Sequence, residues 1–458
     1  MAEVSEIYQG DTGNSDRSDQ TEEAALTPAM ALQKIEAAVN ALFEYRDRYF
    51  EKFGVEKSHK KADDVKAKLK ETLQLISGMK DKINNKAMLN MLQGKALNVT
   101  ADFDQEALDL LSKAVKLDPK LVEAWNHLGE CYWKSGNIPS AKNCFTGALN
   151  YQKNKVSLRN LSMVLRQLSG PPAEKVSLIE ESVEKAKEAI QLDIKDGTSW
   201  LILGNAYLSL FFTAGQNPKV LKQCMSAYAQ AERDPVAQGN PDLHFNRATS
   251  YQYQEEYQQA LAGFDRAMLL DPGWDEPGEK ETQLLQFLGT LTDMINTKGK
   301  MKGKKLESLV LSMNEEKDLG PYRGGSYTGS KGKSVTLKKV KLSDLQPEIN
   351  HERVVTGKVV CTISSQEALT FTFCMVDEDQ TCFPVNVYNI AKGSGVKIGD
   401  SVAIPDPYVQ LVKVNHKEKV FEFSSIRVDL PVMLVVNGRK LGLDKQAMSV
   451  LSVSAMSE

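Results

Sequence analysis

Two carboxylates, a guanidinium and three amides have types and spacing that suggest a binding site. Asp242 and Glu276 are 34 residues apart, and Arg166 lies upstream. The two carboxylates could pair with an arginine of a ligand, and the Arg166 guanidinium could pair with a carboxylate of the same ligand. Side-chain amides could bind the backbone of a peptide. We therefore expect a site for a short extended peptide that carries adjacent opposite charges, with three asparagines holding its backbone: Asn160, Asn205 and Asn246.

Each of these residues also has an ordinary structural interpretation. Asp242 follows Asn240-Pro241 and Glu276 precedes Pro277, so both are typical of a first helical turn, where the helix dipole stabilises a carboxylate. Arg166 is typical of a solvated helix end. The sequence leaves both alternatives open.

Catalytic and metal-binding patterns are not recognisable in the sequence. No nucleophile, base and orienting group stand at a familiar spacing, and the five histidines are dispersed. The six cysteines form no CxxC pair, which predicts reduced structural thiols in a cytosolic or nuclear protein. No apolar run approaches ~18 residues, and 57 basic against 60 acidic residues give a net charge of −3. We expect a soluble protein that is not an enzyme, with no cofactor, no metal and no membrane contact.

The elements that must position the binding residues follow a helical repeat. From Trp125, the pattern continues at offsets of 3, 4, 7, 16, 20 and 23 with Leu128, Gly129, Tyr132, Ala141, Phe145 and Ala148. It predicts two antiparallel helices that pack through these positions, and it resembles the tetratricopeptide repeat. One such unit cannot bury its apolar face alone, so neighbours are required. Repeats of this kind stack into a superhelix with a concave groove. If Trp125 is counted as position 4 of its repeat, the residues at positions 2, 5, 9, 12 and 13 face this groove. Asp242 and Glu276 then both fall at position 2, Arg166 at position 12 and Asn205 at position 9.

The rest of the chain divides by composition and periodicity. We predict an α-helical tetratricopeptide-repeat superhelix of five units followed by a small OB-type β-barrel. The expected order is a disordered acidic tail (1–26), an N-terminal helical cap (27–82), repeats with a C-terminal capping helix (83–296), a mobile Lys/Gly/Ser linker (297–334), the barrel (335–440) and a flexible tail (441–458).

The barrel admits a second hypothesis, that of a single-strand nucleic-acid binder. Its aromatic residues could stack on bases: Phe371, Phe373, Phe383, Tyr388, Phe421 and Phe423. They alternate with polar residues as a barrel interior does, which favours packing in the core.

Lysines form a further candidate contact. Lys113 and Lys116 lie on one helix edge and could contact phosphate groups, whereas a solvated helix face is the ordinary interpretation, which we favour. The linker lysines allow the same two interpretations, a phosphate contact or a solubilising segment: Lys298, Lys300, Lys302, Lys304 and Lys305.

Several stretches, among them KALNVT, LVEAWNHLGE, NPDLHFNRAT and IGDSVAIP, resemble a family of proteins that joins a tetratricopeptide-repeat superhelix to such a barrel. The resemblance implies a cytosolic reader of the Met-Arg-Glu-Ile/Cys start of nascent tubulin at the ribosome. Such a reader triggers tubulin mRNA decay through an adaptor to a deadenylase complex. It also implies a rival role, that of a stress-responsive nuclear transcription cofactor that scaffolds an acetyltransferase coactivator in the DNA-damage response. The protein is therefore expected in the cytoplasm and the nucleus.

Overall fold

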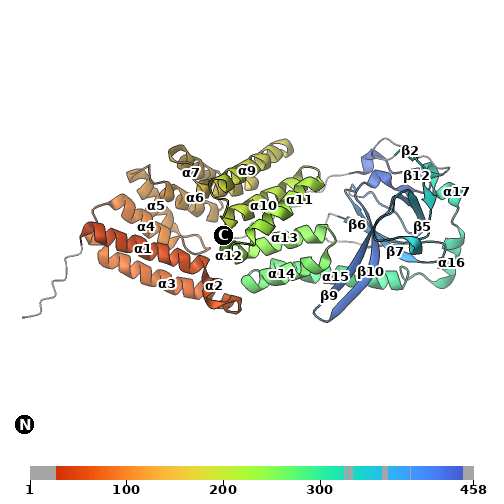
Figure 1. Ribbon diagram of the computed structural model, residues 1–458, viewed down its shortest axis with the longest axis horizontal. Helices are drawn as coiled ribbons and strands as arrows, with labels where there is room; N and C mark the ends of the chain where they lie inside the picture. Colours follow the sequence, from red (N-terminus) through yellow and green to blue (C-terminus); the bar gives the residue numbers. More distant parts are fainter. Residues whose placement is uncertain (1–26, 324–326, 329–333, 364–369, 392, 447–458) are drawn as a thin grey trace, which may run out of the picture.

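The computed structural model describes residues 27–323, 327–328, 334–363, 370–391 and 393–446. The expected tails at 1–26 and 447–458 lie outside them. A curved helical array occupies one end of the long axis, and a sheet-rich domain occupies the other (Figure 1).

The N-terminal cap consists of three helices and a 3-10 turn. Thr27 begins the first helix, because its side-chain oxygen accepts a 3.2 Å hydrogen bond from the Met30 amide and Pro28 occupies the first turn. Apolar residues at three- and four-residue steps, such as Ile35, Val39 and Leu42, are fully buried. The elements are α1 (Pro28–Asp47), α2 (Tyr49–Phe53), η1 (Val55–Lys57) and α3 (Ser58–Met79), followed by η2 (Lys80–Lys82).

Antiparallel helix pairs build the array that follows. Gly129 allows one such pair, α6 and α7, to cross closely, since a methyl group on it would lie 2.5 Å from the Phe145 ring. This is the contact that the repeat pattern predicts, and the predicted tetratricopeptide-repeat fold is confirmed. The helices are α4 (Lys86–Leu97), α5 (Gln105–Leu117), α6 (Val122–Lys134), α7 (Ile138–Tyr151), α8 (Lys155–Gln167), α9 (Pro172–Leu192), α10 (Gly197–Thr213), α11 (Pro218–Ala231), α12 (Pro235–Gln238), α13 (Pro241–Tyr253), α14 (Tyr257–Leu270) and α15 (Glu276–Asn296).

The segment expected to be a mobile linker is partly helical, which corrects that expectation. It contains α16 (Gly303–Leu311), α17 (Glu315–Asp318) and η3 (Gly320–Tyr322). Leu306 of α16 is buried in the same apolar cluster as α15 and the barrel. Gly299, at φ +70°, brings the turn after α15 so close to the strand β5 (Arg353–Ile363) that a methyl group on it would lie 2.5 Å from the Val360 oxygen. Apolar burial thus orders the part of this segment from 297 to 323, whereas 324–326 and 329–333 lie outside the described residues.

The sheet-rich domain closes into a barrel. Its main strands follow the order β8-β5-β6-β7-β10-β9, and β8 and β9 are separated along the chain only by Asp406, whose φ is +42°, and Pro407. The β7–β10 pair is parallel and the other pairs in this order are antiparallel. The predicted OB-type barrel is confirmed. Its elements are β1 (Tyr327–Thr328), β2 (Ser334–Val335), β3 (Lys338–Lys339), η4 (Leu342–Asp344), β4 (Glu348–Ile349), β5 (Arg353–Ile363), β6 (Thr370–Val376), β7 (Cys382–Tyr388), β8 (Ser401–Pro405), β9 (Tyr408–His416), β10 (Lys419–Val428), η5 (Pro431–Met433), β11 (Val435–Val436), β12 (Arg439–Lys440) and η6 (Leu443–Lys445).

The first part of the expected C-terminal tail, residues 441–446, packs on the barrel. The Lys445 carbonyl accepts a 2.8 Å hydrogen bond from the Ala391 amide, and Gln446 bridges to Ile390. The expectation of a flexible tail is therefore wrong for these six residues, because their backbone groups pair with the barrel.

The barrel is fixed to the last repeats by apolar contacts and buried polar contacts. Leu284 and Leu288 of α15 share a buried cluster with Phe421 and Phe423 of β10. These two phenylalanines, proposed as stacking platforms and favoured as barrel core, instead face the helices. Phe373 lies in the barrel core, with Phe371 and Phe383 packed against it. The faces of Phe421 and Phe423 are therefore not open to a nucleic-acid base.

Candidate peptide-binding site

A buried tyrosine joins three helices of the concave face. The Tyr228 hydroxyl of α11 donates a 2.9 Å hydrogen bond to the Asn205 side-chain oxygen of α10. The Asn246 amide of α13 donates a 3.1 Å bond to the same oxygen. All three side chains are at most 4% exposed. Two of the three predicted asparagines therefore meet, and the amide oxygen between them is already satisfied from two sides.

Arg166 and Asp242 both influence the ionisation of the same tyrosine. Burial raises the pKa of Tyr228 well above its ordinary value; among the further influences, the Arg166 charge lowers it and the Asp242 charge raises it. Arg166 lies in the last turn of α8 and donates from Nε to the Ser162 carbonyl at 3.3 Å. Asp242 lies in the first turn of α13 and is 4% exposed. We name the group Arg166, Asn205, Tyr228, Asp242 and Asn246 the Tyr228 cluster.

Glu276 stands apart from the Tyr228 cluster along the array. It is the first residue of α15, one helix pair beyond α13, and it is half-buried. Its position at the start of a helix agrees with both interpretations of the sequence, the groove ligand and the first-turn carboxylate. Its role in binding remains a prediction.

Asn160, the third predicted asparagine, belongs to a second polar group. Its amide donates a 3.2 Å hydrogen bond to Glu130 of α6. The other Glu130 oxygen lies 2.9 Å from Nδ1 of His127 and accepts a 2.9 Å bond from the Asn98 amide. Lys134 completes the group by donating 2.8 Å bonds to both oxygens of Asn98. We name these five residues the Glu130 cluster.

The electrostatics of the Glu130 cluster keep its carboxylate charged. Burial alone would raise the pKa of Glu130, but the charge and hydrogen bond of His127, with Lys134 beyond, lower it to about 2. Burial lowers the pKa of Lys134, and the Glu130 charge opposes that shift. The cluster thus fixes a negative charge at position 9 of its repeat.

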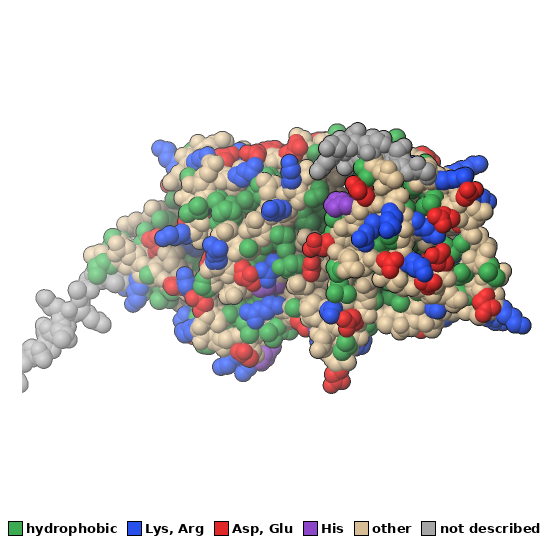
Figure 2. Space-filling view, turned by 45° about the vertical axis from the view of Figure 1, so that its right-hand side comes forward, with side chains coloured by type: hydrophobic (Ala, Val, Ile, Leu, Met, Phe, Trp, Pro, Cys, Tyr) green, Lys and Arg blue, Asp and Glu red, His purple; other side chains and the backbone are tan. Residues whose placement is uncertain are grey.

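Lys113 and Lys116 lie exposed on α5, on the same side of that helix. Figure 2 shows lysines and arginines interspersed with aspartates and glutamates over the face it presents. A phosphate contact by these two lysines would therefore be local, and it remains a prediction.

Sequence reasoning missed the central tyrosine and the Glu130 cluster. Tyr228 occupies the repeat position that Phe145 and Phe264 fill in other units, so its extra hydroxyl was the available signal. His127 is buried, and its contact with Glu130 could not be expected from five dispersed histidines. The repeat pattern marks the packing positions of each unit. It therefore did not mark Glu130, which lies at a groove position.

One group in the described part of the chain has the composition of a metal site. Asp265, Glu281 and His416 have ligand atoms within 4.8 Å of one another. Lys417 already occupies the position of a cation there, with its ammonium 2.6 Å from Glu281 and 2.9 Å from Asp265. The group therefore acts as an ion-pair contact between the repeats and the barrel. Within the described ranges, no helix has the length and apolarity needed to span a bilayer.

The array and the barrel define a tetratricopeptide-repeat protein with a C-terminal OB-type domain. Residues 336–450 match the family model described as the tetratricopeptide repeat protein 5 OB fold domain, and residues 105–161 match a tetratricopeptide repeat model. Human and mouse proteins named tetratricopeptide repeat protein 5 are each 50% identical over 423 residues, 92% of this chain and 96% of theirs. The chain belongs to the tetratricopeptide repeat protein 5 family.

More distant similarities concern the repeats. The Cut9–Hcn1 hetero-tetramer structure of the APC/C is 15% identical, with a TM-score of 0.41, over 56% of this chain and 48% of that one. That likeness is too weak to bear on function. Family membership and the two domains support an adaptor or cofactor role, and repeats of this type generally bind proteins or peptides.

Proposed function

We propose that the protein is a non-enzymatic adaptor for the N-terminal Met-Arg-Glu-Ile or Met-Arg-Glu-Cys motif of nascent tubulin. It binds this motif at the ribosome and triggers decay of tubulin mRNA. The observation that carries the proposal is the buried hydrogen-bonded group of Asn205, Tyr228 and Asn246, in a groove where repeat register also places Arg166 and Asp242. Adjacent opposite charges in a ligand would suit the opposite charges of Arg166 and Asp242.

The ligand residues can be assigned by charge. The peptide arginine pairs with Asp242 or Glu276, and the peptide glutamate pairs with Arg166. Asn205 and Asn246 bind the peptide backbone near Tyr228, and Asn160 does so further along the groove. The low exposure of Asp242 supports a strong pairing, because a charge pair withdrawn from water is screened less.

The remaining partners follow from the family resemblance and from surface charge. Lys113 and Lys116 contact ribosomal RNA, and an adaptor links the protein to a deadenylase complex. This role requires a cytoplasmic protein. In the alternative role, the same groove scaffolds an acetyltransferase coactivator in the nucleus.

Binding of a labelled Met-Arg-Glu-Ile peptide to the full chain tests the proposal. Arg166→Ala and Asp242→Ala should each weaken binding by roughly 2–5 kcal/mol, because each leaves one charge of a desolvated pair unmatched. Arg233→Ala and Asp109→Ala, which change exposed charges elsewhere, are the matched controls and should bind as the wild type does.

A charge-swapped Met-Glu-Arg-Ile peptide provides the decisive comparison. It should bind far more weakly than the native order. Equal binding of both peptides would refute the charge assignment. If neither peptide binds, the nuclear-cofactor role becomes the better hypothesis, and localisation of the protein when tubulin is in excess would test it.

A further inference from the structure

Three thiols lie on adjacent strands of the barrel. Cys361 belongs to β5, Cys374 to β6 and Cys382 to β7, and all three are free. Cys361 and Cys374 are buried and Cys382 is half-buried. All three pack into the apolar cluster that α15 and α16 share with the barrel. Half of the six cysteines in the sequence are therefore gathered where the repeats meet the barrel.

Strand register determines which two of these thiols have the spacing of a disulfide. Cys361 and Cys374 are directly opposite each other in the antiparallel β5–β6 pair. Opposed residues of such a pair have Cα atoms about 4.5–5.5 Å apart, and disulfides span roughly 4.4–6.8 Å between Cα atoms. Cys382 is opposite Val376 instead, which makes it a diagonal neighbour of Cys374, at a distance of about 7–8 Å. The spacing therefore favours the Cys361–Cys374 pair.

The thiols of this pair differ in acidity from those of the repeats. A hydrogen bond with the Cys374 thiol lowers the pKa of Cys361, against the effect of burial. The cysteines of the repeats are held in the neutral form, because burial raises the pKa of each to about 12: Cys131, Cys144 and Cys224. Among these buried thiols, Cys361 most readily forms the thiolate, which is the reactive species of a cysteine.

The turn between α15 and α16 covers Cys361. A methyl group on Gly299 in this turn would lie 3.1 Å from the Cys361 Cβ. The Lys298 ammonium of the same turn donates a 3.5 Å hydrogen bond to the Gln380 side-chain oxygen, which holds the turn against the barrel. Because only 6% of Cys361 remains exposed, a reagent must be small to reach its sulfur.

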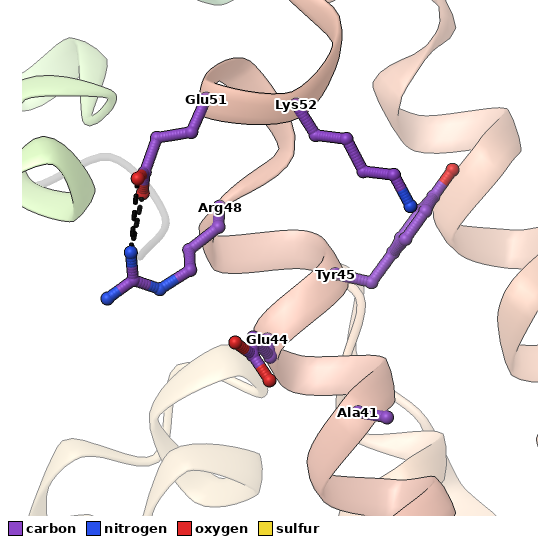
Figure 3. Close-up of a pocket in the computed structure, with 6 residues that line it drawn as sticks. All are labelled: Ala41, Glu44, Tyr45, Arg48, Glu51 and Lys52. Atoms are coloured by element: carbon purple, nitrogen blue, oxygen red, sulfur yellow. Dashed lines mark hydrogen bonds and ion pairs between the residues drawn. The ribbon is translucent and has the colours of Figure 1, made fainter.

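A shallow depression of about 450 Å³ on the N-terminal cap carries no comparable chemistry. Figure 3 shows Arg48 and Glu51 in its lining, paired at 3.1 Å. Phe50, on the same helix α2, packs beside Gly239 of the repeats, where a methyl group would lie 3.2 Å from the Phe50 ring. Ion pairing and packing account for these side chains, and none of them is a thiol.

We propose that Cys361 and Cys374 form a site of reversible oxidation, at which a small hydroperoxide converts the two thiols into a cross-strand disulfide. This site lies in the barrel and is independent of peptide binding in the repeat groove. The two cysteines are not a CxxC pair, so strand pairing alone brings their sulfurs together. Cys361 is the attacking thiol and Cys374 is the resolving thiol.

The reaction balances with hydrogen peroxide as the only oxidant. The Cys361 thiolate attacks one peroxide oxygen, so that a sulfur–oxygen bond forms and the oxygen–oxygen bond breaks. The hydroxide that leaves takes up the proton lost by Cys361, which gives water and a sulfenic acid. The Cys374 sulfur then attacks the Cys361 sulfur, the sulfur–oxygen bond breaks, and the hydroxyl leaves as water with the Cys374 proton. The two thiols together lose the two electrons that the peroxide gains.

Hydrogen peroxide treatment of the full-length folded protein tests this site. Remaining thiols are alkylated before digestion, and peptide mass spectrometry without reduction then maps the disulfides. The Cys361–Cys374 disulfide should be at least about tenfold more abundant than any other, and dithiothreitol should remove it. A dominant Cys374–Cys382 disulfide would overturn the assignment, and so would six free thiols after treatment.

Oxidised glutathione tests the requirement for a small reagent. It should form no mixed disulfide at Cys361 in the folded protein, because the turn that carries Gly299 covers this thiol. In urea, where the cover is lost, the same reagent should modify Cys361. Equal modification of Cys361 in the folded and unfolded protein would contradict the proposed selectivity for a small hydroperoxide.

Two single variants separate the members of the cluster. Cys361→Ser removes the attacking thiol and should abolish the disulfide to Cys374. Cys382→Ser, the matched control from the same cluster, should leave the Cys361–Cys374 disulfide at its wild-type level. Loss of this disulfide in Cys382→Ser would overturn the roles given to the pair. Thermal unfolding shows whether either variant has lost its fold, and the wild-type map stands without them.

Discussion

The Tyr228 hydroxyl donates its 2.9 Å hydrogen bond to the same Asn205 oxygen that accepts from Asn246. One amide oxygen therefore holds α10, α11 and α13 in a fixed relation. Because both donors bind the Asn205 oxygen, hydrogen bonding within the array fixes the orientation of this amide.

Removal of the Tyr228 hydroxyl tests this arrangement. Tyr228→Phe should fold normally, because phenylalanine occupies the matching position in other units, at Phe145 and Phe264. Loss of one neutral hydrogen bond costs about 0.5–1.5 kcal/mol, so we expect peptide affinity to fall by roughly two- to tenfold. Fluorescence anisotropy with the labelled Met-Arg-Glu-Ile peptide measures it. Tyr207→Phe is the control, and an equal loss there would mean that the effect is not specific to the cluster.

The Glu130 cluster predicts a defined dependence of stability on acid. Its folded-state pKa of about 2 lies below the ordinary 4.5 of an unfolded glutamate. A depressed carboxylate pKa stabilises the fold fully above pH 4.5, and this contribution is lost as the pH falls from 4.5 toward 2. Relative to Glu130→Gln, the wild type should therefore lose its advantage in unfolding free energy over this range. Denaturant titrations at pH 6, 5, 4 and 3 measure the difference.

Glu255 provides a control, because its pKa is shifted in the opposite direction to that of Glu130. Burial raises its pKa, and Arg427 and hydrogen bonds from the barrel only partly offset that shift. A raised carboxylate pKa gives a contribution that is present below pH 4.5 and lost as the pH rises through the folded-state value. The wild type should thus lose stability relative to Glu255→Gln as the pH rises. Parallel slopes for the two variants would contradict both assignments.

The sequence predicted those elements whose signal is periodic. Residues at repeat offsets, from Trp125 to Ala148, predicted the helix pairs, and composition and periodicity predicted the barrel over residues 335–440. Asp242 and Arg166 were placed in one groove by repeat register alone. Repeat register permits such a prediction because each repeat unit has the same geometry, so sequence position translates into position along the array.

The features that the sequence did not predict depend on contacts between distant segments. Nothing near Phe50 indicates that its partner is Gly239, and nothing near Leu306 indicates that the barrel covers it. Glu255 has a left-handed φ of +62° and meets Asn386 and Tyr388 more than 130 residues away. Such contacts arise from the way two domains pack, which no local pattern encodes.

The attachment of the barrel should depend strongly on Arg427. Its guanidinium lies 3.8 Å from the Tyr388 ring centre and 4.9 Å from that of Tyr253, and it is 3.5 Å from Glu255. Arg427→Ala leaves the buried carboxylate without its cation and should destabilise the protein by roughly 3–5 kcal/mol. Arg427→Lys keeps the charge but loses the planar stacking, so it should restore only part of the loss.

Chemical denaturation of the full chain measures these changes, together with limited proteolysis of residues 297–334. We expect faster cleavage within residues 297–323 in Arg427→Ala, because release of the barrel exposes α16 and α17. Arg439→Ala, at an exposed position of β12, is the matched control. An Arg427→Ala protein as stable as this control would show that the apolar contacts of α15 are sufficient.

Lys113 and Lys116 should affect ribosome association without affecting peptide binding. Both are exposed on α5, and neither belongs to the Tyr228 cluster. The Lys113→Glu, Lys116→Glu variant replaces two positive charges with two negative ones, so any phosphate contact at this edge becomes repulsive and salt-dependent association weakens. Stability should change by no more than about 0.5 kcal/mol per site, since neither side chain is buried. Co-sedimentation with translating ribosomes over a salt series, alongside peptide anisotropy, measures both properties. Unchanged co-sedimentation would eliminate this surface as the ribosome contact, whereas loss of peptide affinity as well would mean that the substitutions had disturbed the array.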